Sequence, residues 1–135
     1  MSSKTIPGSC LCKAVQITAR IEHEAFEVCH CGMCRKWAGA PAMVLEPTMD
    51  VTFDDTNNIT VYESSEWAER GFCKTCGSNI FYRLKEDGRY FLQMGLFDGT
   101  DSFEFKKQIF IDHKPDNYSF ADKTETMTAA EVFEN

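Results

Sequence analysis

Residues 71–78 read Gly-Phe-Cys-Lys-Thr-Cys-Gly-Ser, a C-x-x-C sequence in which two thiols are three positions apart. Two further cysteine clusters precede it in the 135-residue chain: the C-x-C pair Cys10 and Cys12, and the triple cluster Cys29-His30-Cys31-Gly32-Met33-Cys34. Every one of the seven cysteines belongs to a cluster. Thiolates at such short spacing can bind one metal ion from a tight turn, whereas disulfides between such close neighbours are strained. The spacing therefore predicts metal binding rather than seven separately buried thiols.

The number of sulfur ligands indicates two unequal metal sites. Seven cysteines cannot complete two four-cysteine sites, so they divide naturally into four and three. A closed four-sulfur site is structural, whereas three protein ligands leave one position for water or substrate. Thiolates favour zinc or an iron–sulfur cluster, and the short knuckles are closer to zinc ribbons than to ferredoxins. Spacing leaves the pairing of clusters open; the division we favour joins the two pairs and leaves the triple cluster as the open site.

The composition is that of a single acidic globular domain. Fourteen Lys and Arg residues against 21 Asp and Glu residues give a net charge of −7, which disfavours nucleic-acid partners. The longest uncharged stretch, Trp37 to Leu45, is about half of what a bilayer span requires. The first eight residues contain no apolar signal segment, and the cysteine count is odd. We therefore expect one domain over residues 1–135 in a reducing, cytoplasmic compartment, with no membrane partner.

Strand patterning dominates the chain. Apolar and polar residues alternate from Val15 to Ile21, and short β-prone runs recur about every ten residues. Helix signals are limited to one turn at 34–37 and a capping box at Thr128 and Glu131. These patterns predict a mainly β, antiparallel fold. We expect Glu22, Glu24 and Glu27 to lie in a solvated loop rather than to act as catalytic acids. The expected strands cover residues 15–21, 42–45, 51–53, 59–62, 71–73, 79–84, 90–97 and 103–111.

The clusters and their flanking residues form an ordered series of motifs. The series runs through Gly8-Ser9-Cys10-Leu11-Cys12, Cys29–Lys36, Gly39-Ala40-Pro41, Tyr62-Glu63-Ser64-Ser65 and Arg70–Ser78. In this order the motifs resemble the glutathione-dependent formaldehyde-activating enzyme family, over a core of about residues 6–120. Three departures concern the substrate more than the metal sites: Lys13 replaces a frequent Gly, Gln108 a frequent His and Asn117 a frequent Trp.

The resemblance implies an antiparallel β-tent, zinc-ribbon-like fold with two zinc ions per chain. It implies carbon–sulfur lyase chemistry, in which formaldehyde is reversibly joined to the glutathione sulfur as S-hydroxymethylglutathione, with the thiol at the open zinc. A non-catalytic zinc module that recognises other proteins is the alternative, since centromere protein V contains a related domain. A metal-free redox protein is a third hypothesis. The implied ligands are Cys10, Cys12, Cys73 and Cys76 for the structural zinc, and Cys29, Cys31 and Cys34 for the second zinc.

Basic residues near the clusters are candidates for binding or charge compensation. Arg35 follows Cys34 directly and could hold a glutathione carboxylate through its planar fork, whereas Lys36 is better explained as a solvated charge. Arg70 could offset the negative charge of a thiolate cluster or pair with a carboxylate.

The three histidines have separate expectations. His30 lies between two expected zinc ligands, so its side chain should point away from their metal. His23 and His113 are isolated and should be structural or exposed, although either could close the second site as a fourth ligand.

Overall fold

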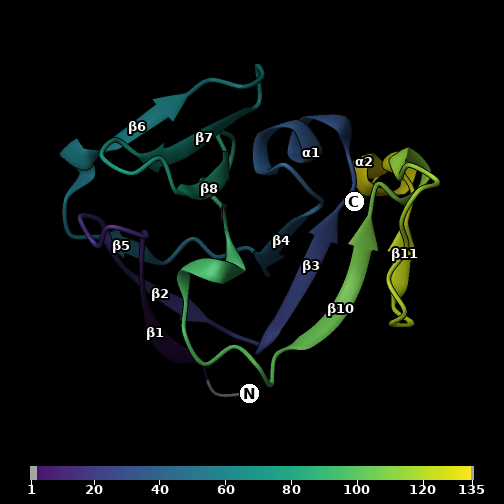
Figure 1. Cartoon of the computed structure of the whole chain (residues 1–135), viewed down its shortest axis with the longest axis horizontal. Coiled ribbons are helices and arrows are strands. Elements are labelled where there is room, and N and C mark those ends of the chain that lie inside the picture. Colours follow the sequence, from purple (N-terminus) through teal and green to yellow (C-terminus); the bar gives the residue numbers. More distant parts are fainter. Residues whose placement is uncertain (1–2, 135) are drawn as a thin grey trace.

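The structure is a computed structural model that describes residues 3–134 (Figure 1). Residues 1, 2 and 135 of the predicted domain lie outside this part. The first sheet has the order β1-β2-β5, with bounds Lys4–Ser9, Gln16–Ile21 and Val51–Phe53. The second sheet has the order β11-β10-β3-β4, with bounds Glu125–Met127, Glu104–Ile109, Ala25–Cys29 and Ala42–Leu45. The third sheet has the order β6-β7-β8-β9, with bounds Ile59–Tyr62, Ala68–Cys73, Asn79–Leu84 and Tyr90–Leu92.

Helices are short in the described part. The α-helices are α1 (Gly32–Ala38) and α2 (Ala129–Glu134), and the 3-10 helices cover Thr56–Asn58, Met94–Leu96 and Ile111–His113. The predicted capping box begins α2: the Thr128 amide donates to Glu131 Oε1 at 2.8 Å, and the Glu131 amide donates to Thr128 Oγ1 at 3.2 Å. No helix among residues 3–134 combines the length and apolar character that a bilayer span requires.

Most neighbouring strands pair antiparallel, which confirms the predicted mainly antiparallel β fold. The exceptions are in the second sheet, where β10 runs parallel to both β3 and β11. The chain returns to pair β10 with β3 only after it has built the third sheet, and such a long connection permits parallel pairing.

The strand positions agree best with the sequence where short runs of apolar or aromatic residues occur. The predicted strands 42–45, 51–53, 59–62 and 79–84 coincide with β4, β5, β6 and β8. The predictions 90–97 and 103–111 were too long, because each run ends in a 3-10 helix. β1 was missed because it contains Pro7 and Gly8; as an edge strand it accommodates a proline without losing a central ladder bond.

The predicted solvated acidic loop is wrong at Glu27. This residue lies in β3 between β4 and β10 and is 6% exposed, and its carboxylate is 3.9 Å from Lys107 Nζ. Burial raises the pKa of the Glu27 carboxyl. Glu22 and Glu24 are exposed, as predicted.

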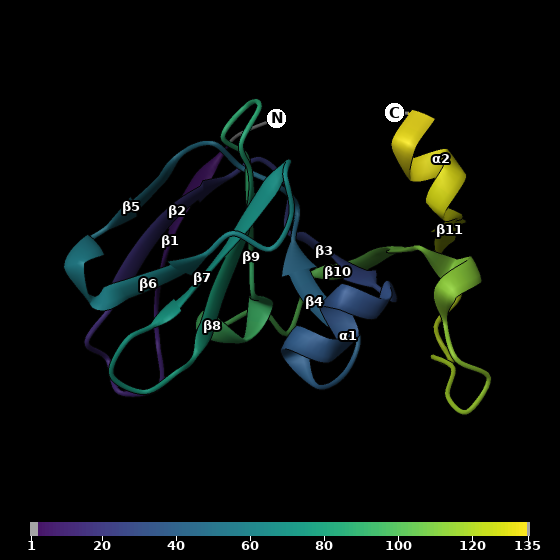
Figure 2. The same cartoon turned by 90° about the horizontal axis from the view of Figure 1, so that it is seen from above.

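The main core lies between the first and third sheets, which form two adjacent layers in Figure 2. Ile17 of β2, Ile80 of β8 and Leu92 of β9 are at most 1% exposed and belong to this core. Cys10 and Cys73 belong to the same cluster, so the first cysteine of each turn is anchored in the packed interior, whereas Leu11 and Cys12 are exposed.

We expect Gly71→Ala to destabilise this core. A Cβ atom at Gly71 would lie 2.4 Å from the Phe81 ring, and that ring is itself held against Tyr90 at a centroid distance of 4.9 Å. The free energy of unfolding should fall by about 1–3 kcal/mol, measured by urea denaturation. Gly95→Ala is the control, because a Cβ there meets nothing within 4 Å. Equal stability of the two variants would contradict the packing argument.

Candidate metal centres

The first cysteine group unites the two pairs that are far apart in sequence. The sulfur atoms of Cys10, Cys12, Cys73 and Cys76 all lie within 4.8 Å of one another. Two of the separations are 3.7 Å, between Cys10 and Cys12, and 3.8 Å, between Cys12 and Cys73. A tetrahedron with zinc–sulfur bonds of about 2.3 Å has sulfur–sulfur edges of about 3.8 Å. The donor set therefore fits a closed four-coordinate zinc.

The C-x-x-C turn directs both of its sulfurs to this group. The Cys76 amide donates to Cys73 Sγ at 3.4 Å, and the Gly77 amide donates to the Cys73 carbonyl at 2.8 Å. Gly77 has a φ of 78°, in the left-handed region where glycine has no Cβ penalty. A hydrogen bond from Ser78 lowers the pKa of Cys76 to about 5, which favours the thiolate.

In the C-x-C turn, backbone amides likewise donate to the sulfur and the carbonyl of the first cysteine, but from different positions along the chain. The Val15 amide donates to Cys10 Sγ at 3.3 Å, and the Lys13 amide donates to the Cys10 carbonyl at 3.1 Å. Lys13 has a φ of 68°, in the left-handed region that disfavours a residue with a Cβ. This conformation explains why glycine suits position 13, where this chain has lysine.

The second cysteine group lies where β3 passes into α1. Cys29 ends the strand, Cys31 is the N-cap of the helix, and Cys34 lies in its first turn. Their sulfurs lie within 4.8 Å of one another, and the Cys34 amide donates to Cys31 Sγ at 3.3 Å. Within residues 3–134, no histidine, aspartate or glutamate joins these sulfurs at that distance. Three thiol ligands without a fourth protein ligand are the donor set of a metal site of the catalytic type.

The three thiols share their protons unequally. Hydrogen bonds from Cys29 and Cys34 lower the pKa of Cys31 to about 2, while hydrogen bonding to Cys31 raises the pKa of Cys29. Because three neighbouring thiolates repel one another, their simultaneous ionisation needs a cation among them. A divalent metal supplies that charge.

Arg70 of β7 contacts this group from the third sheet. It is 4% exposed, and its Nη2 is 3.9 Å from Cys34 Sγ. The guanidinium carbon lies 5.0 Å from the ring centre of Trp37 and 4.9 Å from that of Tyr82. No carboxylate among the described residues forms an ion pair with Arg70. Of the two roles that the sequence suggested for Arg70, the structure favours compensation of thiolate charge.

His30 is held away from the sulfurs by hydrogen bonds at both ring nitrogens. Its Nδ1 is 2.8 Å from the Tyr118 hydroxyl, and its Nε2 is 2.8 Å from Gln108 Oε1. Because the Gln108 carbonyl oxygen only accepts, Nε2 carries the proton and Nδ1 accepts from Tyr118. Burial lowers the pKa of His30 and keeps it neutral. The ring therefore orients the turn rather than binding the metal.

Arg35 and Lys36 line a depression of about 490 Å³ on α1. Arg35 Nε donates to the His30 carbonyl at 2.9 Å, which fixes one edge of the guanidinium. The α1 residues of this depression are spaced by three and four positions, so they share a face that Cys34 does not occupy. Gly32, next to Cys31, connects that face to the cysteine group. The remaining lining residues are Gly39, Ala40, Pro41, Pro115, Asn117 and Tyr118.

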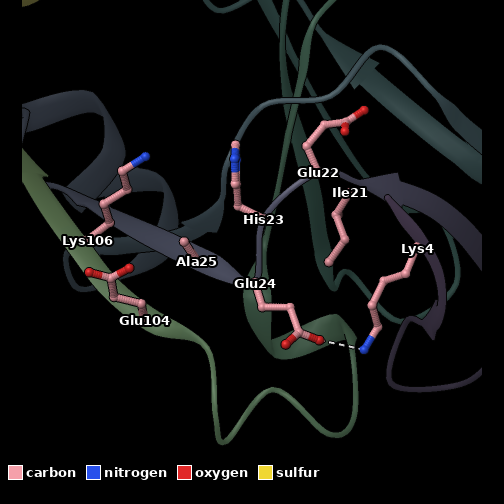
Figure 3. A pocket seen from close by; sticks show the side chains of 8 residues that line it. All are labelled: Lys4, Ile21, Glu22, His23, Glu24, Ala25, Glu104 and Lys106. Carbon is pink, nitrogen blue, oxygen red and sulfur yellow. Dashed lines mark hydrogen bonds and ion pairs between the residues drawn. The ribbon is translucent and has the colours of Figure 1, made fainter. Parts of the chain in front are cut away.

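His23 and His113 are both exposed, and neither joins the cysteine groups. His23 Nδ1 is 2.9 Å from Glu46 Oε1, and His23 lines a depression of about 440 Å³ shown in Figure 3. Ala25, at the start of β3, lines the same depression, whereas Cys29 lies at the strand's other end. The structure therefore does not support either histidine as a fourth metal ligand.

This chain is similar to known proteins in sequence and in fold. The family model for the glutathione-dependent formaldehyde-activating enzyme matches residues 5–113. A protein of Schizosaccharomyces pombe (strain 972 / ATCC 24843), named as an uncharacterized lyase, is 39% identical over 129 residues, covering 95% of this chain and 94% of its own. A crystal structure of a Rhodobacter sphaeroides protein is similar in fold, with a TM-score of 0.56 and 24% identity; the match covers 70% of this chain and 89% of that chain.

We expect serine substitutions in the two cysteine groups to have different effects. A structural zinc contributes on the order of 10–16 kcal/mol, about the stability of a whole domain, so Cys10→Ser should give unfolded or insoluble protein. Cys31→Ser should remain folded and lose one of two zinc ions per chain. Elemental analysis and thermal unfolding measure both effects. A soluble Cys10→Ser protein with an unchanged unfolding curve and full metal content would contradict the assignment.

Proposed function

The chain belongs to the glutathione-dependent formaldehyde-activating enzyme family, and we propose that it is a zinc-dependent carbon–sulfur lyase for a glutathione adduct. The observation that carries this proposal is the three-sulfur group of Cys29, Cys31 and Cys34, which no other metal-binding side chain of the described residues completes. The substrate would be of the S-hydroxymethylglutathione type. Its sulfur would take the fourth position of the second zinc.

The chemistry requires a thiolate and a carbonyl at one place. In the joining direction, the glutathione sulfur attacks the carbonyl carbon of formaldehyde, and the proton lost by the thiol ends on the hydroxyl oxygen of the adduct. Cleavage is the reverse. Zinc in such a site lowers the pKa of a bound thiol and can polarise a carbonyl oxygen. Cys29, Cys31 and Cys34 would hold this zinc, and the closed group of Cys10, Cys12, Cys73 and Cys76 would hold a structural one.

The depression beside α1 suits the carboxylates of glutathione. Arg35 keeps guanidinium nitrogens besides the Nε that binds the His30 carbonyl, and an arginine fork pairs well with a carboxylate. Lys36 lies on the same face but is exposed, and we expect it to remain a solvated charge. Because Gly32 lines the depression directly after Cys31, a peptide lying there could extend its thiol around the start of the helix.

A non-catalytic zinc module remains the competing hypothesis, and one feature favours it. The edge strand β6 exposes the apolar side chains of Val61 and Tyr62, and Trp67 beyond it is also exposed. Exposed apolar groups of this kind can mark a protein-recognition surface.

The test combines an activity assay with spectroscopy of the metal. We expect the zinc-loaded protein to form and cleave S-hydroxymethylglutathione faster than the spontaneous reaction. In the cobalt-substituted protein, millimolar glutathione should change the visible spectrum, because sulfur would enter the coordination sphere. Cys31→Ser should remove both effects without unfolding the chain. An unchanged cobalt spectrum in the wild type would favour the non-catalytic module.

A second prediction concerns Arg35. Removing a charge-assisted hydrogen bond to a carboxylate weakens binding, so Arg35→Ala should raise the KM for the adduct about tenfold or more. The kcat should change little, since Arg35 would bind a remote group. Lys36→Ala, on the same face of α1, is the matched control and should stay within about threefold. A larger effect at Lys36 than at Arg35 would reverse the assignment of the carboxylate contact.

A further inference from the structure

Arg70 is a buried cation that is held by aromatic rings rather than by acids. Arg70 and Tyr82 are directly opposite each other in the β7–β8 pair, so their side chains share one face of the sheet. Trp37 reaches the guanidinium from α1 at 5.0 Å, close to the 4.9 Å of Tyr82. The guanidinium is therefore fixed between the third sheet and the helix that carries Cys34.

Two other arginines that lie over aromatic rings, Arg83 and Arg89, also pair with carboxylates. Arg83 also lies over a tyrosine, Tyr90, at 5.5 Å, but its Nη1 is 3.8 Å from Glu69. Arg89 pairs with Asp87 at 2.8 Å. A buried charge without a counter-ion is strongly unfavourable, so the environment of Arg70 must contain a negative charge from another source.

The sulfur group is that source. Nη2 of Arg70 is 3.9 Å from Cys34 Sγ, and three thiolates around one divalent metal have a net charge of −1. We propose that Arg70 is a positioning residue that balances the charge of the metal bound by Cys29, Cys31 and Cys34. This inference rests on the proposed function only in requiring a divalent metal at that group.

The positive charge of Arg70 also affects whether a neutral or an anionic ligand is favoured at the fourth coordination position of this metal. A neutral ligand leaves the complex at −1, whereas a thiolate brings it to −2. A fixed cation at Cys34 stabilises the second state more than the first, since the attraction grows with the charge. Arg70 therefore makes the site more favourable for an anionic sulfur ligand than three cysteines alone would.

The experiment measures zinc affinity without any glutathione. Arg70→Met removes the charge and keeps an unbranched apolar side chain between Trp37 and Tyr82. Competition with a chelator should show the affinity of the three-cysteine site falling about 10–100-fold, as for other residues that support metal ligands. The four-cysteine site should keep its zinc. Arg83→Met is the matched control, because Arg83 also stacks on a tyrosine, and it should leave both affinities unchanged.

Folded Arg70→Met protein that binds two zinc ions with wild-type affinity would overturn the proposal. If Arg70→Met does not fold, Arg70→Lys decides the matter, because it keeps the charge and loses the planar group. Its second-site affinity should stay within about tenfold of wild type; a loss as complete as in Cys31→Ser would show that charge is not the requirement. Absence of lyase activity would leave these affinities unaffected, so the two proposals fail separately.

Discussion

The structure depends on the meeting of four sulfurs from two distant turns. Cys12 and Cys73 are 61 positions apart, and their sulfurs lie at 3.8 Å. Bringing such distant turns together has an entropic cost that grows slowly with loop length, whereas a zinc–thiolate site contributes on the order of 10–16 kcal/mol. The closed loop contains β2 to β6, α1 and the whole triple cluster. The closed site therefore determines where the open one can be.

Strand β7 connects the two cysteine groups. Cys73 at its end belongs to the closed group, and Arg70, three residues earlier and about 10 Å along a strand, contacts Cys34 of the open group. The tight fit of Gly71 on Phe81 fixes this strand against β8 between the two positions. One short strand therefore carries both a ligand of the closed group and the cation beside the open group.

The sequence predicted the local chemistry better than the long-range contacts. Counting ligands gave the four-and-three division, and short apolar or aromatic runs located β4, β5, β6 and β8. The pairing of clusters came from the family resemblance, because spacing contains no information on which distant turns meet. β3 was missed because acidic residues precede its apolar positions, and Glu27 is buried only because two strands flank it. The partners of Arg70 depend on strand register and on the place of α1, which no local pattern specifies.

The departures from the family pattern at positions 13 and 108 change the backbone and the hydrogen bonds beside the cysteine groups. They leave all seven cysteines in place. At position 13 lysine adopts the left-handed backbone that glycine would accept without strain, and all four sulfurs still meet. At position 108 glutamine accepts from His30 through Oε1 and donates to Thr124 through Nε2 at 3.2 Å. A neutral amide can do both at once, so the buried His30 stays neutral and the segment before β11 is tied to the cysteine turn. Gln108 thus holds the His30 ring beside the open group without adding a second titratable side chain, and the three sulfurs of that group still meet.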